Sequence, residues 1–209
     1  MTCCYDAPPA SGPVAVRLDL PEAWTDAPER LQRARGPSAV TLQTKPQIAL
    51  ALLDQARQWG VPHRGVVTDA DDGDNPHCLA GVEERNERYV VAIRGDLQVR
   101  PKWRGAPPSQ RADQVLAAVA RCQWRTIRWR HGTKGWWRQP CGAIRAWRLT
   151  AEGEARIGWL LGERAARGQP EEHQCSWSNR PASATWEELV AYAHRRHAIE
   201  PFHEEAKEE

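Results

Sequence analysis

The chain has 209 residues, of which 41% are hydrophobic and 27% are charged, and its formal net charge is +2. This balance is typical of a folded globular protein and excludes a chain that is disordered throughout. No apolar run approaches the roughly 18 residues that a membrane span needs. The first residues also lack the pattern of a secretory signal, so the cytoplasm is the expected compartment.

The cysteines are scattered along the chain and form no CxxC pair. They are Cys3, Cys4, Cys78, Cys122, Cys141 and Cys175. Zinc sites usually combine cysteine pairs at a regular spacing. The pattern therefore predicts reduced thiols rather than a structural metal centre.

The first part of the chain contains short elements of both kinds. Residues 14–20 alternate apolar and polar side chains and predict a strand. A short helix is expected over residues 27–35. Thr44 and Gln47 have the spacing of a capping box, which predicts a helix that begins there and ends at Gly60.

Strands and helices continue to alternate over the next stretch. Residues 64–68 carry β-branched side chains and predict a short buried strand, which runs into the acidic turn of residues 69–74. A helix over residues 76–85 and a second buried strand over residues 89–93 follow. This order predicts an α/β fold with a partly parallel sheet.

The second half of the chain is rich in tryptophan and arginine. After a helix over residues 112–121, strands are expected at residues 124–130, 142–150 and 156–162. From Arg121 to Arg148 there is no Asp or Glu, and tryptophans alternate with arginines. Such a pattern favours a surface that contacts phosphates and stacks on bases, and it also fits an amphipathic β region with its tryptophans inside.

Asp69 is the first candidate site residue, because it directly follows a buried strand, where α/β folds carry their reactive groups. A carboxylate there suits Mg²⁺, which prefers oxygen ligands. Two other interpretations stay open. Asp69 and Asp71 fit the paired carboxylates of a metal-dependent phosphohydrolase, and the aspartates also suit a polar turn that caps the next helix.

Thr185 and Glu188 form a second capping box, which predicts a helix that runs to the last residue. The side chains that share one face of this helix are Arg196, Glu200, His203 and Lys207. A glutamate between cations suits a helix that binds metal and phosphate. An exposed face of ion pairs is the alternative interpretation.

Several stretches resemble blocks of the IS701-like transposases, which are IS4-type DDE enzymes of insertion sequences. Residues 66–74 resemble the block around the second catalytic aspartate, and residues 195–207 resemble the helix with the third acid, including its R-E-K spacing. Further stretches resemble the upstream blocks and the insertion of that family; they are residues 18–24, 44–46, 129–135, 159–163 and 178–181. The similarity covers the chain from about residue 14 to its end.

The resemblance implies an RNase H-like α/β fold, with a mixed sheet flanked by helices and a β-rich insertion before the last acidic helix. It divides the chain into an unmatched segment 1–13, a partial catalytic core 14–96, a Trp/Arg-rich insertion 97–182 and the C-terminal acidic helix 183–209. The family's first aspartate lies upstream of the block at Leu18, and no aspartate here has that context. The first strands are therefore expected to be missing.

The family activity implied is Mg²⁺-dependent DNA strand cleavage and strand transfer, in which three carboxylates hold two Mg²⁺ ions. Asp69 and Glu200 correspond to the second and third acids, and thus to the catalytic and metal-binding residues. The residues implied in DNA contacts are Arg196, Lys207, Arg130, Lys134, Trp136 and Trp137. The implied partner is DNA, both transposon ends and target, and the resemblance allows a homodimer.

The departures from the family pattern predict a catalytically incomplete fragment. Besides the absent first acid, Asp72 replaces a tyrosine and His197 replaces a tryptophan of the family. Pro201 directly follows Glu200, and a proline disfavours helical geometry at the residue before it. A metal-dependent phosphohydrolase and a non-catalytic DNA-binding module remain the alternative functions.

Overall fold

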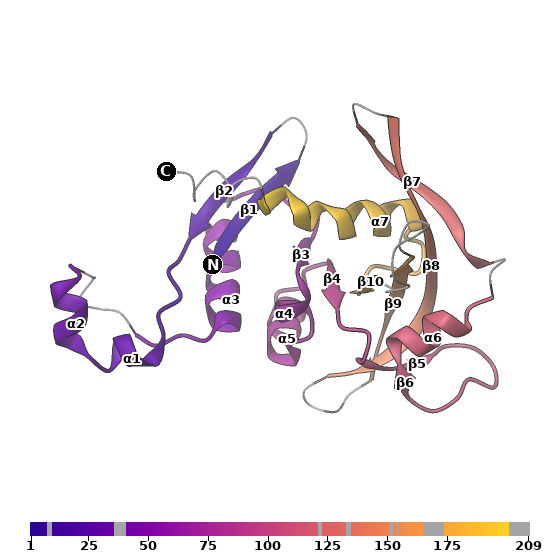
Figure 1. Ribbon diagram of the computed structural model, residues 1–209, viewed down its shortest axis with the longest axis horizontal. Helices are drawn as coiled ribbons and strands as arrows, with labels where there is room; N and C mark the ends of the chain where they lie inside the picture. The colour runs from indigo at the N-terminus through magenta and orange to yellow at the C-terminus, as the bar shows by residue number, and fades with distance from the viewer. Residues whose placement is uncertain are drawn as a thin grey trace. The chain divides into compact units, whose positions relative to one another are not determined.

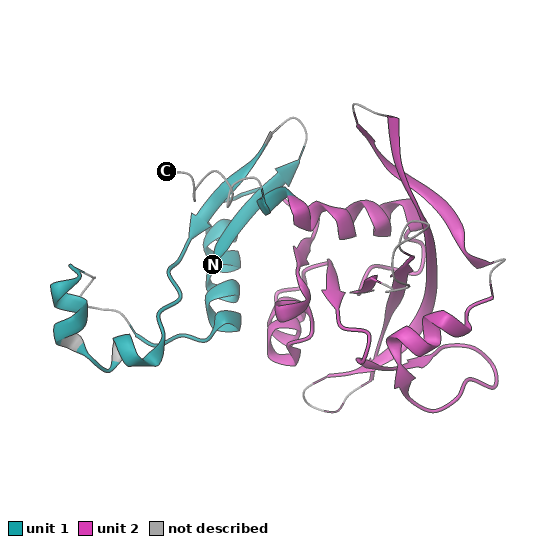
Figure 2. Cartoon of the chain, in the orientation of Figure 1, with its two compact units in different colours: residues 1–62, 198–209 teal, residues 63–197 magenta. Residues whose placement is uncertain are grey.

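The computed structural model describes residues 1–7, 10–35, 41–120, 123–132, 135–150, 153, 155–164 and 174–200. The chain forms two compact units (Figure 2). The first comprises residues 1–62 and 198–209, and the second comprises residues 63–197. The predicted catalytic core 14–96 is thus shared between the two units, and its second part lies in the same unit as the predicted insertion.

The first unit is built around a two-stranded antiparallel sheet of β1 (Thr2–Ala7) and β2 (Ala10–Val16). Helix α3 (Lys45–Gln58) covers it, and its apolar stripe buries Ile48 and Leu52 against Ala15. Two short helices, α1 (Glu22–Thr25) and α2 (Pro28–Arg33), contact each other in the same unit.

The predicted start of α3 is confirmed. The Thr44 side chain accepts a hydrogen bond from the Gln47 backbone N–H, and the Gln47 side chain accepts one from the Thr44 N–H at 2.8 Å. Both bonds satisfy donors that a helix start otherwise leaves unpaired. Gly60 follows the helix with a φ of +68°, a conformation that favours glycine.

The predicted strand over residues 14–20 is only partly correct. Strand β2 begins earlier and ends at Val16, where Thr2 of β1 is its pairing partner. The Arg17 N–H still reaches the Met1 carbonyl, but Leu18 is 77% exposed. An alternating pattern forms a strand only where the backbone of a neighbouring strand can form hydrogen bonds with it. Pairing of β2 with β1 stops at Val16, so the strand ends there.

The second unit contains a mixed eight-stranded sheet whose order is β3-β4-β10-β9-β8-β5-β6, with β7 paired to β8 (Figure 1). Its strands are β3 (Val66–Thr68), β4 (Tyr89–Ile93), β5 (Gln98–Pro101), β6 (Gln110–Arg111), β7 (Arg125–Gly132), β8 (Gly135–Leu149), β9 (Ala155–Glu163) and β10 (Gln174–Ser178). Strands β3 and β4 are parallel, and the other pairs are antiparallel. The predicted β-rich part of the chain therefore extends the sheet that carries Asp69.

Helices flank this sheet. Leu189 and Val190 of α7 (Trp186–Arg195) pack in one cluster with Val90 and Leu161, whereas Leu116 of α6 (Ala112–Ala118) packs against Gly162. Neighbouring residues of a strand face opposite sides, so α7 and α6 cover opposite faces of the sheet. Helices α4 (Ala70–Gly73) and α5 (Pro76–Glu84) lie between β3 and β4 in the chain, and α4 contacts β4.

The C-terminal helix departs from its prediction. Its capping box at Thr185 and Glu188 is confirmed, but α7 ends at Arg195 and a 3-10 turn over Arg196–Ile199 follows. A 3-10 turn has about three residues per turn, so Arg196 and Glu200 do not share one α-helical face. The proline at 201 has no N–H to donate four residues back, which fits the change of helix type.

No helix in the described part of the chain is long and apolar enough to cross a membrane.

Candidate active site

Asp69 lies where the sequence predicts it, directly after β3. Its Oδ1 accepts hydrogen bonds from the backbone N–H groups of Asp71, at 3.2 Å, and Asp72, at 3.3 Å. The carboxylate thus caps α4, as one of the alternative interpretations predicts. Its Oδ2 has no protein partner among the described residues, and the side chain is exposed, so one oxygen remains available to a ligand.

The rest of the acidic turn is held against β4. Gly73 is buried, and a Cβ placed on it would collide with the Ala92 carbonyl oxygen, so only glycine allows this close approach. Asp74 accepts hydrogen bonds from the Arg94 backbone N–H and forms an ion pair with its side chain at 2.9 Å. Burial raises the pKa of Asp74, and Arg94 offsets only part of that effect. The turn is therefore anchored by Asp74, which leaves Asp69 at its exposed end.

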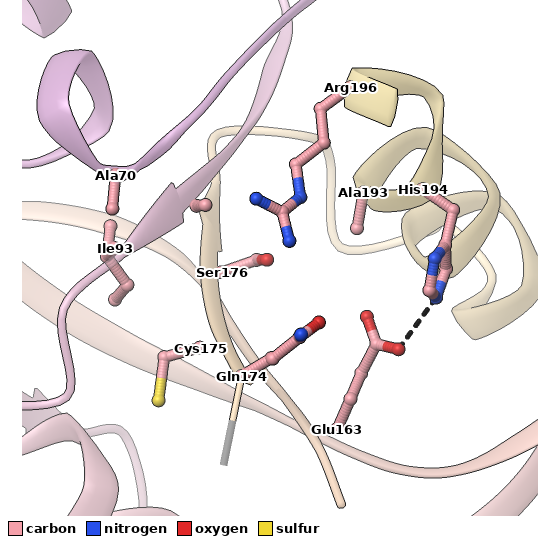
Figure 3. Close-up of a pocket in the computed structure, with 10 residues that line it drawn as sticks. Ala70, Ile93, Glu163, Gln174, Cys175, Ser176, Ala193, His194 and Arg196 are labelled. Atoms are coloured by element: carbon pink, nitrogen blue, oxygen red, sulfur yellow. Dashed lines mark hydrogen bonds and ion pairs between the residues drawn. The ribbon is translucent and has the colours of Figure 1, made fainter. Parts of the chain in front are cut away.

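A pocket of about 180 Å³ opens beside the Asp69 turn. Ala70 forms part of its wall, and β4, β9, β10, α7 and the 3-10 turn after α7 contribute the remainder (Figure 3). The polar and charged side chains that line it are Glu163, Gln174, Ser176, His194 and Arg196. The pocket lies entirely within the second unit.

Glu163 and His194 form a hydrogen-bonded pair in this pocket. Glu163 is only 3% exposed, and its Oε2 lies 2.7 Å from His194 Nε2. The His194 ring also stacks on Trp129, with ring centroids 4.0 Å apart and planes at 6°. Neither residue of this pair was predicted from the sequence, although Trp159, Leu161 and Glu163 share one face of β9 and so place a carboxylate on an otherwise apolar face.

The β7–β8 hairpin carries three of the predicted DNA-contacting residues, Arg130, Trp136 and Trp137. Trp136 and Trp137 are 54% and 59% exposed, and Arg130, which pairs across the strands with Trp137, is exposed as well. Trp137 also contacts the edge of Trp129, at 6.5 Å between centroids. Aromatic rings therefore connect the hairpin to the pocket that contains His194.

The remaining predicted residues have different positions. Arg196 lines the pocket, whereas Glu200 is exposed and belongs to the first unit, so its pairing with Asp69 in one site stays a prediction. Lys134, Lys207 and His203 lie outside the described residues.

The described residues do not form a metal-binding cluster. These residues contain no group of three or more His, Cys, Asp or Glu side chains that could hold a metal ion. Mg²⁺ requires several oxygen ligands at near-ideal octahedral geometry. One free oxygen of Asp69 does not provide the three carboxylates of a two-metal site, so the described residues do not fit that centre.

The cysteines of the described residues are reduced thiols; they are Cys3, Cys4, Cys78, Cys141 and Cys175, and Cys122 lies outside those residues. Burial raises the pKa of Cys78 to about 11 and that of Cys175 to about 12. Thiols in such surroundings are largely unreactive.

Comparison with known proteins identifies the family. A family model described as DDE superfamily endonuclease matches residues 7–136. The chain belongs to this family. The matched residues include β2, the Asp69 turn and the β7–β8 hairpin as far as Trp136. No curated protein matches the chain.

Membership explains the main features of the fold. The mixed sheet flanked by helices agrees with the RNase H-like fold that the sequence predicts for DDE endonucleases. Such nucleases act on DNA and in general use divalent metals, so the family implies a DNA substrate. Asp69 lies within the matched region and α7 lies beyond it.

Proposed function

We propose that the chain is the nuclease-type domain of an insertion-sequence transposase of the IS701-like group, which binds DNA but does not cleave it alone. The match of the DDE endonuclease family over residues 7–136 supports this proposal most strongly. Asp69, at the carboxyl end of β3, takes the place of a metal-binding acid, and Glu200 that of a second. In an active enzyme of this type Mg²⁺ would be the metal.

The surface that supports DNA binding is the β7–β8 hairpin. Arg128 and Arg138 form a cross-strand pair, and both are exposed, as are Arg130 and the neighbouring Trp136 and Trp137. Arginines contact phosphates without reading the sequence, and tryptophans stack on unpaired bases. The hairpin therefore fits a DNA backbone with unpaired bases next to it.

Truncation of the hairpin tryptophans is expected to weaken DNA binding. Replacing both Trp136 and Trp137 with alanine should lower the affinity for a duplex with a single-stranded end by about tenfold or more, because stacking contributes roughly 1–3 kcal/mol per base. Fluorescence anisotropy of labelled DNA measures this effect. Trp103→Ala is the matched control, since Trp103 is 45% exposed in the same unit but outside the hairpin. Equal losses in both variants would contradict the proposal.

The same titration at several salt concentrations tests the phosphate contacts. Each neutralised phosphate contributes about 0.9 to the slope of log affinity against log salt. Changing Arg128, Arg130 and Arg138 to glutamine should therefore reduce that slope by about 3. An affinity that does not depend on salt would exclude this surface as a DNA-binding site.

The alternative phosphohydrolase depends on Asp71, which is exposed and contributes its backbone N–H to the Asp69 cap. With Mg²⁺, the chain alone is expected neither to hydrolyse p-nitrophenyl phosphate nor to nick plasmid DNA, because the described residues do not gather the required ligands. Hydrolysis of the phosphomonoester that Asp71→Ala abolishes would establish the phosphohydrolase. Nicking that Asp69→Ala abolishes and Asp71→Ala preserves would instead show that the chain is active.

A further inference from the structure

The sheet of the second unit has an open face where β5, β8 and β9 lie side by side. In β5, Val99 is 1% exposed, whereas its neighbour Arg100 is exposed. Neighbouring residues of a strand face opposite sides, so Val99 and its buried pairing partner Arg148 mark the covered face of the sheet. Arg100 lies on the opposite, open face, and its pairing partner there is Trp147.

This open face carries apolar side chains in adjacent rows. Trp147 pairs with Ile157 of β9, and both are half-buried. In the next row, Leu149 pairs with Ala155 and is 63% exposed. The face of an antiparallel sheet that points to water usually carries polar side chains. A contiguous set of tryptophan, isoleucine and leucine on such a face therefore indicates an interaction surface.

Helix α7 covers a different part of the same face. The main contacts of α7 with the sheet are with β3, β4 and β7. Trp159 packs at the margin of the α7 cluster, and its Nε1 donates to the Pro181 carbonyl at 3.0 Å. Trp147 and Ile157 lie one row further from α7, beyond this contact. Within the described part of the chain, this end of the face thus remains open.

The same rows carry positive charge. The Arg100 guanidinium is exposed and has no hydrogen-bond or ion-pair partner among the described residues. The Lys102 ammonium lies over the Trp147 ring, 5.9 Å from its centroid, and Arg145 lies over the Trp159 ring at 5.1 Å. The described residues of these rows include no Asp or Glu. A partner that complements this surface therefore combines negative charge with apolar groups.

The aliphatic side chains favour a protein over a nucleic acid as that partner. Arginines and tryptophans, as on the β7–β8 hairpin, suit phosphates and bases. Leu149 and Ile157 match neither a phosphate nor a flat base, but they match the apolar side of an amphipathic helix.

We propose that the face formed by Arg100, Lys102, Trp147, Leu149 and Ile157 binds an acidic, amphipathic segment of another protein. The apolar side chains of that segment pack on Trp147, Leu149 and Ile157, and its carboxylates face Arg100 and Lys102. This interaction goes beyond the proposed DNA binding and does not require it, because the two surfaces share no residue.

Binding of a labelled peptide to the full chain tests this inference. The probe is a fluorescein-labelled peptide of about 15 residues, with leucines at helical spacing and glutamates between them. The native chain should bind it. Arg100→Gln should weaken binding by about fivefold through the lost charge, and Leu149→Ser by about tenfold through the lost apolar contact. Both side chains are exposed, so neither variant removes a core contact.

Two matched controls separate this face from the rest of the surface. Arg156→Gln changes the residue before Ile157 on β9, whose side chain is on the opposite face, towards Glu83. Leu18→Ser changes a leucine that is 77% exposed in the first unit. Both controls should bind the peptide as the native chain does. Losses as large as those in Arg100→Gln and Leu149→Ser would overturn the proposal.

A second peptide, with lysines in place of the glutamates, tests charge complementarity. The native chain should bind it at least about tenfold more weakly than the acidic peptide, and added salt should weaken the binding of the acidic peptide. Equal binding of the two peptides, or no binding of the acidic one, would overturn the proposal.

Two further measurements distinguish other occupants of this face. Arg100→Gln and Leu149→Ser should leave the affinity for a single-stranded oligonucleotide unchanged, whereas a loss equal to that for the peptide would make the face part of a DNA site. Sedimentation equilibrium should give the same mass for the native chain and Leu149→Ser. A native dimer that Leu149→Ser dissociates would show that a second copy covers the face, and would overturn the proposal.

Discussion

Replacement of Glu83 by glutamine is expected to lower the free energy of unfolding by about 3 kcal/mol, because it leaves a buried arginine without its counter-charge. Arg148 is only 5% exposed, and its Nη2 lies 3.6 Å from Glu83 Oε1. Among the residues that the structure describes, its Nε has no hydrogen-bond partner. Thermal or urea unfolding of the variant, followed by circular dichroism, measures the loss.

The loss of stability is expected to be large because Glu83, on α5, contacts residues of three strands of the second unit. From α5 it accepts a hydrogen bond from the Tyr89 hydroxyl of β4 at 2.6 Å. It also faces Arg148 of β8 and, at 3.8 Å, Arg156 of β9. Burial raises the pKa of Tyr89, so the hydroxyl keeps its proton and remains a donor. Without the charge of Glu83, the two arginines would lie side by side on β8 and β9 with no shared counter-charge.

A double-mutant cycle tests this explanation. Arg148→Met should cost less than Glu83→Gln, because Glu83 keeps the Tyr89 hydroxyl and Arg156 as partners, whereas Arg148 is left without a counter-charge in Glu83→Gln. The combination Glu83→Gln with Arg148→Met should then recover most of the stability that Glu83→Gln loses. Glu84→Gln is the control at the neighbouring exposed position. Purely additive effects would show that the two side chains do not interact.

The elements that the sequence predicted correctly depend on local signals. The Thr44 and Thr185 caps each satisfy backbone donors within one helical turn, so four residues are enough to predict where α3 and α7 begin. Asn75 caps α5 in the same way, with its side chain accepting from His77 and Cys78. The apolar, β-branched run of β4 likewise predicts a strand buried on both faces.

Features that depend on distant residues were not predictable. The Glu163–His194 pair joins residues 31 positions apart, and it forms only because β9 directs Glu163 to the face that α7 covers. Strand β1 was not predicted, because its extended conformation depends more on pairing with β2 and on packing against α3 than on its own composition. The end of α7 was misplaced, although Pro201 already disfavours a continuous helix.

The Asp69 turn combines both kinds of information. The sequence predicted that Asp69 follows a buried strand, and the family resemblance identified it as the candidate second acid. The sequence did not show how close the turn comes to β4. A Cβ added to Gly73 would lie 3.1 Å from the Val91 Cβ, and it would lie even closer to the Ala92 carbonyl oxygen. The position of Asp69, the candidate metal ligand, thus depends on Gly73, which has no functional group of its own.

Gly73→Ala is accordingly expected to destabilise the second unit by about 3 kcal/mol, at the upper end of the range for overpacked cores. The clash is with a backbone carbonyl, which cannot rotate away, so α4 must move from β4. That movement displaces Asp69, which caps α4, and Ala70, which lines the pocket. Thermal or urea unfolding of the variant, followed by circular dichroism, measures the loss of stability.

Gly12→Ala provides the comparison, because no atom lies within 4 Å of a Cβ placed on Gly12. Its effect should stay within about 0.5 kcal/mol, as for other substitutions in open space. Gly73 has no left-handed backbone conformation, so the expected difference between the two variants comes from space alone. Equal stability of Gly73→Ala and the native chain would mean that α4 does not lie against β4, and that the position of Asp69 relative to the pocket is different from the one described.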